Sequence, residues 1–287
     1  MVIAVTYLAA QARADDEAPP ERVTFASADG HTTLVGYLYK PAIMSAARVP
    51  AVVLMHGRAG VYSSRAAGVY DASTLSLRHK AWGRIWSAAG YIALLVDGFG
   101  PRGYPQGFPR FSYASRPEAL SEVTVRPLDA YGALAYLRTR TDVIGDRVGL
   151  QGWSNGASTA IVTMSVEAPG ITAPTPDSGF RAALAFYPAC SLKGVFEDKP
   201  FHPYAPVLVL SGTSDEEVSY ERCEALVEAS RAEGGKVEIK LYDGATHGFD
   251  SPDRSRQEID ANARATYDAV ERSLRFFARH LGSQARD

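Results

Sequence analysis

Short, unbroken apolar runs recur along this chain and constrain its fold more than any other feature. They lie at residues 49–55, 91–96, 148–151, 182–187 and 206–210. A strand with one face in solvent alternates apolar and polar residues, whereas a strand buried on both faces of a parallel sheet is apolar throughout. The runs therefore predict a parallel sheet that is covered on both faces.

Helical patterns separate these runs, at residues 75–89, 125–138, 157–166 and 220–232. A last strand at residues 236–242 precedes a long helix in which apolar residues recur at steps of three and four. This stripe consists of Ile259, Ala263, Tyr267, Val270, Leu274, Phe277 and Leu281. Repeated strand-helix units predict one twisted, mostly parallel sheet with helices on both faces.

The residues before the first buried run follow another pattern. Segments 22–28 and 32–40 alternate around Asp29-Gly30, which is typical of an antiparallel hairpin. The 287 residues contain no internal repeat, low-complexity tract or evident linker. The expected fold class is therefore α/β, as one domain over residues 21–287 that begins with this hairpin.

Residues 1–20 have two interpretations. The segment 2–10 is short and apolar, and the small residues Ala10, Ala12 and Ala14 follow the pattern of a signal peptidase site. A basic region before the apolar segment is missing. A remnant of a secretory signal implies a periplasmic or secreted protein, whereas a flexible arm leaves a cytoplasmic protein as the alternative.

Charge and composition exclude several classes of partner. The chain has 30 Lys and Arg against 32 Asp and Glu, a net charge of -2, and no long run of like charges, which argues against nucleic acid or an anionic membrane. No apolar stretch reaches the roughly 18 residues of a spanning helix. No histidine-cysteine cluster indicates a metal site. We expect a small-molecule substrate and no cofactor, and the oligomeric state stays open.

The strongest chemical signal is the string Gly152-Trp153-Ser154-Asn155-Gly156, where a predicted strand passes into a predicted helix. Ligands of parallel α/β sheets bind beyond the carboxyl ends of the strands. A strained turn that lifts a serine above the sheet leaves no room for side chains two residues before and after it. The string predicts that Ser154 attacks an acyl carbon; the alternative is a glycine-rich turn with an exposed serine.

A serine hydroxyl needs a base to take its proton. Among six histidines, His247 follows the last predicted strand in the loop before the final helix, and we expect it to be this base. Asp215, after the preceding strand, is expected to orient the imidazole. Glu216 and Glu217 are competitors for that role, and Asp243 is a more remote one.

An oxyanion needs two backbone donors. The N–H of Asn155 lies at a helix start, where it can face a developing negative charge. The loop after the first parallel strand, His56-Gly57-Arg58-Ala59-Gly60, offers the N–H of Arg58 as the second donor. We expect His56, at the strand end, to hold this loop by hydrogen bonds and not to serve as a second base.

The sequence resembles the dienelactone hydrolase family of α/β-hydrolases. The matching segments are 56–60, 96–103, 129–134, the string around Ser154, 186–190, 206–215 and 246–250. They cover most of the chain after residue 45. The resemblance implies an α/β-hydrolase fold and ester hydrolysis by Ser154, Asp215 and His247 in that chain order.

Two cysteines, Cys190 and Cys223, follow a predicted strand and lie near a predicted helix start. If the preceding strands are neighbours, the two thiols lie within bridging range; two free core thiols are the alternative. The resemblance favours the bridge, because similar relatives are often exported and carry cysteines in comparable positions. Export to an oxidising compartment agrees with a bridge.

The founding type of the family uses a cysteine nucleophile, whereas this chain has Ser154, which shifts the expectation from dienelactones toward broader carboxylic esters. The expected substrate-binding residues are Arg58, Tyr62, Phe99, Arg102 and Trp153. Arg58 and Arg102 can hold a carboxylate with two-pronged contacts, although Arg102 can equally tie down its own loop. A peptidase, an acyltransferase and a non-catalytic small-molecule binding protein are the rival functions.

Overall fold

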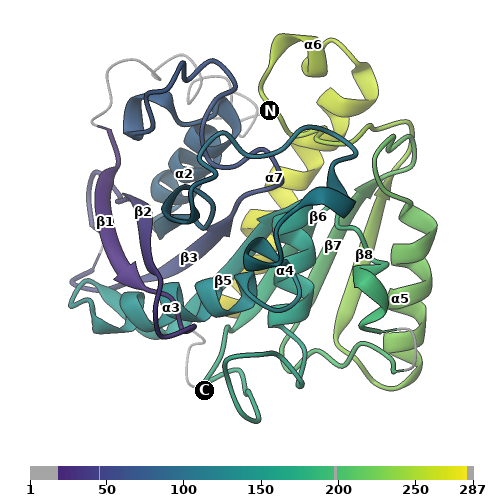
Figure 1. The fold of residues 1–287 in the computed structure, drawn as a ribbon. Coiled ribbons are helices and arrows are strands. Elements are labelled where there is room, and N and C mark those ends of the chain that lie inside the picture. Colours follow the sequence, from purple (N-terminus) through teal and green to yellow (C-terminus); the bar gives the residue numbers. More distant parts are fainter. Residues whose placement is uncertain (1–18, 45, 197–198, 283–287) are drawn as a thin grey trace.

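A computed structural model describes residues 19–44, 46–196 and 199–282 of the chain, so the predicted signal segment lies outside the described residues. Eight strands of the described part form one sheet in the order β1-β2-β4-β3-β5-β6-β7-β8 (Figure 1). They are β1 (Glu21–Ala26), β2 (Thr33–Tyr39), β3 (Val49–Met55), β4 (Ile92–Asp97), β5 (Val143–Trp153), β6 (Ala182–Phe186), β7 (Val207–Gly212) and β8 (Val237–Tyr242).

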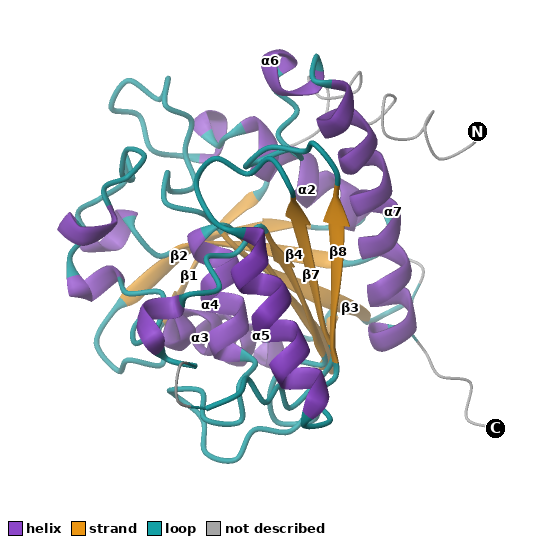
Figure 2. Ribbon diagram, turned by 90° about the vertical axis from the view of Figure 1, so that its right-hand side faces the viewer, coloured by secondary structure: helices purple, strands orange, loops and turns teal. Residues whose placement is uncertain are grey.

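The predicted hairpin and parallel sheet are both confirmed. β1 pairs with β2 and β2 with β4 in antiparallel register, and every other neighbouring pair is parallel. The longer helices are α2 (Leu77–Ala88), α3 (Arg126–Thr139), α4 (Asn155–Thr163), α5 (Tyr220–Ala232) and α7 (Asp260–Leu281), with the short α6 (Arg254–Gln257) before the last. α3, α4 and α5 cover one face of the sheet, and α2 and α7 cover the other (Figure 2).

Two apolar cores explain the unbroken runs of the sequence. In β3, Val53 and Met55 point into the core beneath α3 and α4, whereas Val52 and Leu54 point into the core beneath α2 and α7. Successive side chains of a strand alternate between its faces, so a strand inside this sandwich needs apolar residues at every position.

The apolar stripe predicted for the last helix is partly wrong. Ile259 and Tyr267, two of its members, are exposed. The buried face of α7 instead includes small and polar residues, among them Asn262, Thr266 and Ser273. Asn262 and Thr266 are buried because they hydrogen-bond to the segment after β8, for example from Asn262 Nδ2 to Thr246 Oγ1 at 3.0 Å.

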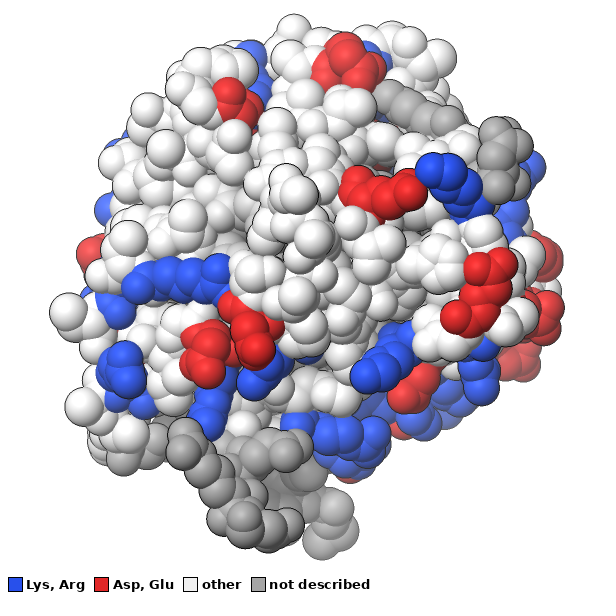
Figure 3. Space-filling view, turned by 90° about the horizontal axis from the view of Figure 1, so that it is seen from below, with Lys and Arg blue, Asp and Glu red and all other residues white. Residues whose placement is uncertain are grey.

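The surface agrees with the expected balance of charge. On the face seen from below, at the amino ends of β7 and β8, Lys and Arg are interspersed with Asp and Glu (Figure 3). Among the helices of the described residues, none combines the length and the apolar character that crossing a membrane requires.

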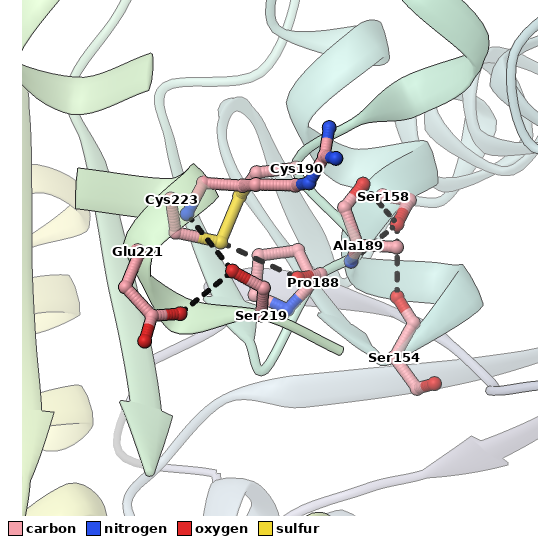
Figure 4. The surroundings of a disulfide bond; sticks show 9 residues. Ser154, Ser158, Pro188, Ala189, Cys190, Ser219, Glu221 and Cys223 are labelled. Carbon is pink, nitrogen blue, oxygen red and sulfur yellow. Dashed lines mark hydrogen bonds between the residues drawn. A yellow bond between two sulfur atoms is a disulfide. The ribbon is translucent and has the colours of Figure 1, made fainter. Parts of the chain in front are cut away.

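A disulfide joins Cys190, after β6, to Cys223 in the first turn of α5 (Figure 4). The two Cα atoms are 5.0 Å apart, and Cys223 is fully buried. β6 and β7 are neighbours, so the chain leaves both strands at the same edge of the sheet. The single bridge that the sequence left open is therefore present.

We predict that reduction of this disulfide destabilises the protein. The bridge spans a sequence separation of 33 residues, and restricting a loop of that length in the unfolded chain stabilises the fold by about 3–4 kcal/mol. Urea unfolding of the oxidised protein, the reduced protein and the Cys190→Ala/Cys223→Ala variant measures the loss. The last two are expected to coincide, and equal stability of all three would contradict the prediction.

Candidate active site

Ser154 lies at a sharp turn between β5 and α4. Its backbone has φ 52° and ψ -118°, a strained conformation for a residue with a side chain. A Cβ on Gly152 would overlap the carbonyl of Gly156, and one on Gly156 would overlap the carbonyl of Met55. Both glycines of the string are therefore steric requirements of this turn, as the sequence indicated.

His247 and Asp215 line up behind Ser154. The Ser154 hydroxyl lies 3.0 Å from His247 Nε2, and His247 Nδ1 lies 2.8 Å from Asp215 Oδ2. Asp215 follows β7 and His247 follows β8, so adjacent strands carry the two residues. The backbone N–H groups of Glu217 and Val218 donate to Asp215 Oδ1 at 2.8 and 2.9 Å, which fixes its carboxylate.

The competing acids have other partners. Glu216 Oε2 accepts the backbone N–H of His247 at 2.9 Å. Glu217 receives two hydrogen bonds of 3.0 Å from the guanidinium of Arg58, and its Oε2 lies 3.8 Å from His247 Nε2. Burial raises the pKa of Glu217, but the hydrogen bond from Arg58 and the positive charges around it hold that pKa below its usual value overall. Asp243 accepts a hydrogen bond from Thr213.

The two expected oxyanion donors flank the serine. Asn155 is the first residue of α4, and an N–H at that position has no acceptor within the helix. The loop that carries Arg58 packs on the turn so closely that a Cβ on Gly57 would lie 3.4 Å from Ser154 Cβ. Arg58, Ser154 and Asn155 line one common cavity.

His56 holds this loop, as expected. Its Nδ1 lies 2.7 Å from the carbonyl oxygen of Gly57, and its Nε2 accepts the backbone N–H of Gly98 at 3.4 Å. Complete burial, together with the nearby charge of Arg126, lowers the pKa of His56 well below its usual value. A neutral imidazole with both nitrogens engaged supports the loop.

Arg126 is a residue of this site that the sequence did not reveal. It begins α3, is fully buried, and donates from one nitrogen to the side chain of Asn155 and from another to the His56 carbonyl at 2.8 Å. Burial lowers its pKa to about 10, so it stays a cation near neutral pH. Its guanidinium thus ties together the two loops that carry the expected oxyanion donors. No local motif marks such a role, because it depends on contacts remote in sequence.

Asp250 is the second unforeseen residue. Its buried carboxylate accepts the indole N–H groups of Trp82 and Trp153, each at 2.8 Å, and the Tyr187 hydroxyl at 2.5 Å. Arg78 donates to it at 3.1 Å. The Tyr187 ring lies edge-on to His247, with 4.7 Å between the centroids. Asp250 therefore connects the His247 loop to Trp153, the residue before Ser154. The only feature of the sequence that could have indicated this role is the position of an acid three residues after His247.

The expected substrate-binding residues divide into two groups. Arg58, Tyr62 and Trp153 line a cavity of about 900 Å³ beside Ser154. Phe99 and Arg102 line neither this cavity nor a second one of about 420 Å³.

Arg102 holds Asp129 with two hydrogen bonds of 2.8 Å and Asp29 with one of 3.0 Å. Phe99 is fully buried against His56 and Phe108. The contacts of Phe99 and Arg102 hold the loop after β4 in place. For Arg102 this is the alternative to substrate binding, that it ties down its own loop.

Comparison with known proteins gives the family. Residues 34–281 match the sequence model of the dienelactone hydrolase family. No curated protein matches the sequence.

Within the described residues, no group of three or more His, Cys, Asp or Glu side chains is placed to hold a metal ion.

Solved structures share the fold at low sequence identity. Esterase 2 of Thermogutta terrifontis with bound propionate superposes with a TM-score of 0.61 and 19% identity, over 94% of this chain and 97% of the esterase. The same esterase phosphorylated by paraoxon gives 0.62 and 20%, over 93% and 96%. A candidate dienelactone hydrolase from Klebsiella pneumoniae gives 0.63 and 18%, over 90% and 99%. Family match and fold agree: the chain belongs to the dienelactone hydrolase family and is a carboxylic ester hydrolase.

Proposed function

We propose that the enzyme hydrolyses carboxylic esters through an acyl-enzyme formed on Ser154, with His247 as base and Asp215 as the orienting acid. The observation that carries the proposal is the continuous line from the Ser154 hydroxyl to His247 at 3.0 Å and from His247 to Asp215 at 2.8 Å. A nucleophile within hydrogen-bond reach of a base, itself oriented by a third group, is the arrangement that activates a serine.

The geometry defines a role for each group. His247 Nε2 takes the proton of Ser154 as its oxygen bonds to the acyl carbon, and Asp215 stabilises the imidazolium that results. The backbone N–H groups of Asn155 and Arg58 stabilise the negative charge on the former carbonyl oxygen. His247 then gives its proton to the departing alcohol as the acyl-oxygen bond breaks, and a water molecule releases the acid by the same steps.

The disulfide supports a place for the enzyme outside the reducing cytoplasm. Disulfides persist in the periplasm and in secreted proteins and are rare in the cytosol. We therefore place the enzyme in the periplasm or among secreted proteins.

The domain proposed for residues 21–287 agrees with the single sheet, which β1 begins at Glu21, and with α7, which packs on it up to Leu281.

We predict that an organophosphate such as paraoxon, which phosphorylates the Thermogutta esterase, labels this enzyme at Ser154 and stops hydrolysis of phenyl acetate. Ser154→Ala is expected to lower kcat by about 10³-fold or more, because the nucleophile is lost. Peptide mass mapping locates the label, and Ser115→Ala, at an exposed serine outside both cavities, is the control. Full activity of Ser154→Ala, or a label elsewhere, would refute the role of Ser154.

A second prediction separates Asp215 from its neighbour in sequence. Asp215→Asn keeps the shape of the side chain but removes the charge that stabilises the imidazolium, and we expect kcat to fall by about 10³-fold to 10⁴-fold. Glu216→Gln removes a charge one residue away, where the carboxylate meets His247 only at its backbone N–H and otherwise pairs with Arg110 and Arg256, and is expected to lose less than about tenfold. Steady-state kinetics on one ester compares them, and the reverse ranking would assign the orienting role to Glu216.

A third prediction concerns Arg126 as a positioning residue. Arg126→Lys cannot bridge Asn155 and the His56 carbonyl with one planar group, so we expect kcat to fall by about 10-fold to 100-fold with little change in KM. Affinity for a boronic acid, which mimics the tetrahedral oxyanion, is expected to fall in parallel. Arg140→Lys, at the other end of the same helix, is the control. Unchanged boronic acid affinity would leave Arg126 only a structural role.

A further inference from the structure

Two cavities meet at Ser154. The larger, of about 900 Å³, and the smaller, of about 420 Å³, are both lined by Ser154 and by the paired side chains of Arg58 and Glu217. An ester whose acyl carbon contacts the Ser154 oxygen can therefore place its acyl group and its alcohol group in different cavities. This step rests on the proposed function of Ser154.

The positions of the base and of one oxyanion donor decide which group goes where. His247 lines the larger cavity and not the smaller, whereas Asn155 lines the smaller and not the larger. The departing oxygen has to lie within hydrogen-bond reach of His247 Nε2 to receive its proton. The alcohol group therefore occupies the larger cavity, and the acyl group lies in the smaller cavity beside Asn155.

The larger cavity is unusually polar. Besides Ser154, seven serine and threonine residues line it, together with seven arginine and lysine residues. Ligand cavities are more often lined by apolar side chains with a few polar groups. Hydroxyl groups both donate and accept hydrogen bonds, and guanidinium groups offer several donors, so this lining fits a ligand rich in oxygen atoms.

The cations of the lining do not require an anionic ligand. Several of them are already paired with carboxylates: Arg78 with Asp250, Arg110 and Arg256 with Glu216, and Arg254 with Glu258. The lining also contains Glu217 and Asp253, and carboxylates can accept hydrogen bonds from hydroxyl groups. A neutral alcohol that carries several hydroxyl groups satisfies both kinds of lining.

The smaller cavity limits the acyl group. Phe111, Tyr113, Ala189, Cys190 and Val218 supply its apolar surfaces, and the charged residues Arg58, Arg116, Glu122, Glu217 and Arg222 also line it. The disulfide of Cys190 fixes one wall, and Ser158 links Ala189 of that wall to Ser154, since Ser158 Oγ accepts the Ala189 N–H at 3.0 Å and donates to the Ser154 carbonyl at 3.4 Å (Figure 4). The exposed ring of Phe111 lies on another side.

We propose that the enzyme acts on compact acyl groups esterified to hydroxyl-rich alcohols, of the sugar or polyol class, with the acyl group in the smaller cavity and the alcohol in the larger. The specificity-determining surfaces are the hydroxyl-bearing and charged residues of the larger cavity and the apolar wall beside Cys190 in the smaller.

Two exposed serines give a matched pair of variants. Ser64 lines only the larger cavity and Ser191 only the smaller. Ser64→Trp is expected to lower kcat/KM at least tenfold for butyryl glucose and less than twofold for methyl butyrate. Relative to the unchanged enzyme, Ser191→Trp is expected to lower kcat/KM at least tenfold for methyl hexanoate, whose acyl group is longer than that of methyl acetate. It is expected to leave kcat/KM for acetyl glucose within twofold. Exchanged sensitivities would overturn the assignment of the cavities.

The class of alcohol is tested on the unchanged enzyme. We expect kcat/KM for butyryl glucose to exceed that for cyclohexylmethyl butyrate, which has an alcohol of similar size without free hydroxyl groups, at least tenfold. Equal values or a preference for the cyclohexyl ester would overturn the proposal for the alcohol. Phenyl acetate hydrolysis and labelling of Ser154 report on the proposed function alone, so a failure there is distinguishable from a failure of the cavity assignment.

Discussion

The close approach of three backbone segments at Ser154 is the constraint on which the site depends. Gly156 allows the turn after β5 to press against the end of β3, where a side chain would overlap the carbonyl of Met55, and Gly152 lets the turn close on the carbonyl of Gly156. The strained φ of 52° at Ser154 is retained because β5 fixes one end of the turn and α4 the other. The same contact sets the Arg58 loop beside the serine, so one steric condition positions the proposed nucleophile and both proposed oxyanion donors.

Buried charge then holds this arrangement in place. Arg126 and Asp250 are each enclosed in the protein, and burying a lone charge is costly unless hydrogen bonds satisfy it. Arg126 connects the Asn155 and His56 loops, and Asp250 connects Trp153 to the His247 loop. A change that frees one of these loops leaves a buried charge without its partner. The two interactions therefore make the site rigid by penalising its rearrangement.

Most of the fold was predictable from the sequence, because burial on both faces imposes apolar residues along strands such as β3 and, up to Val96, β4. The candidate nucleophile, base and acid were predictable because each follows a strand at one edge of the sheet. The buried face of α7 was not, since its polar residues Asn262 and Thr266 are satisfied by partners remote in sequence. The sequence also did not distinguish Arg126, which contacts the site, from Arg102, which contacts only the loop that supports it.

Side-chain reach explains how three consecutive carboxylates acquire three tasks. The short side chain of Asp215, held by two backbone N–H groups, meets the imidazole of His247. Glu216 is one methylene longer and reaches the backbone of His247, while Glu217 pairs with Arg58 and keeps one oxygen 3.8 Å from His247 Nε2. The Glu217–Arg58 pair lines both cavities, so the loop that carries Asp215 also shapes the boundary between them. A substitution in this loop that moves Asp215 would therefore alter rate and substrate preference together.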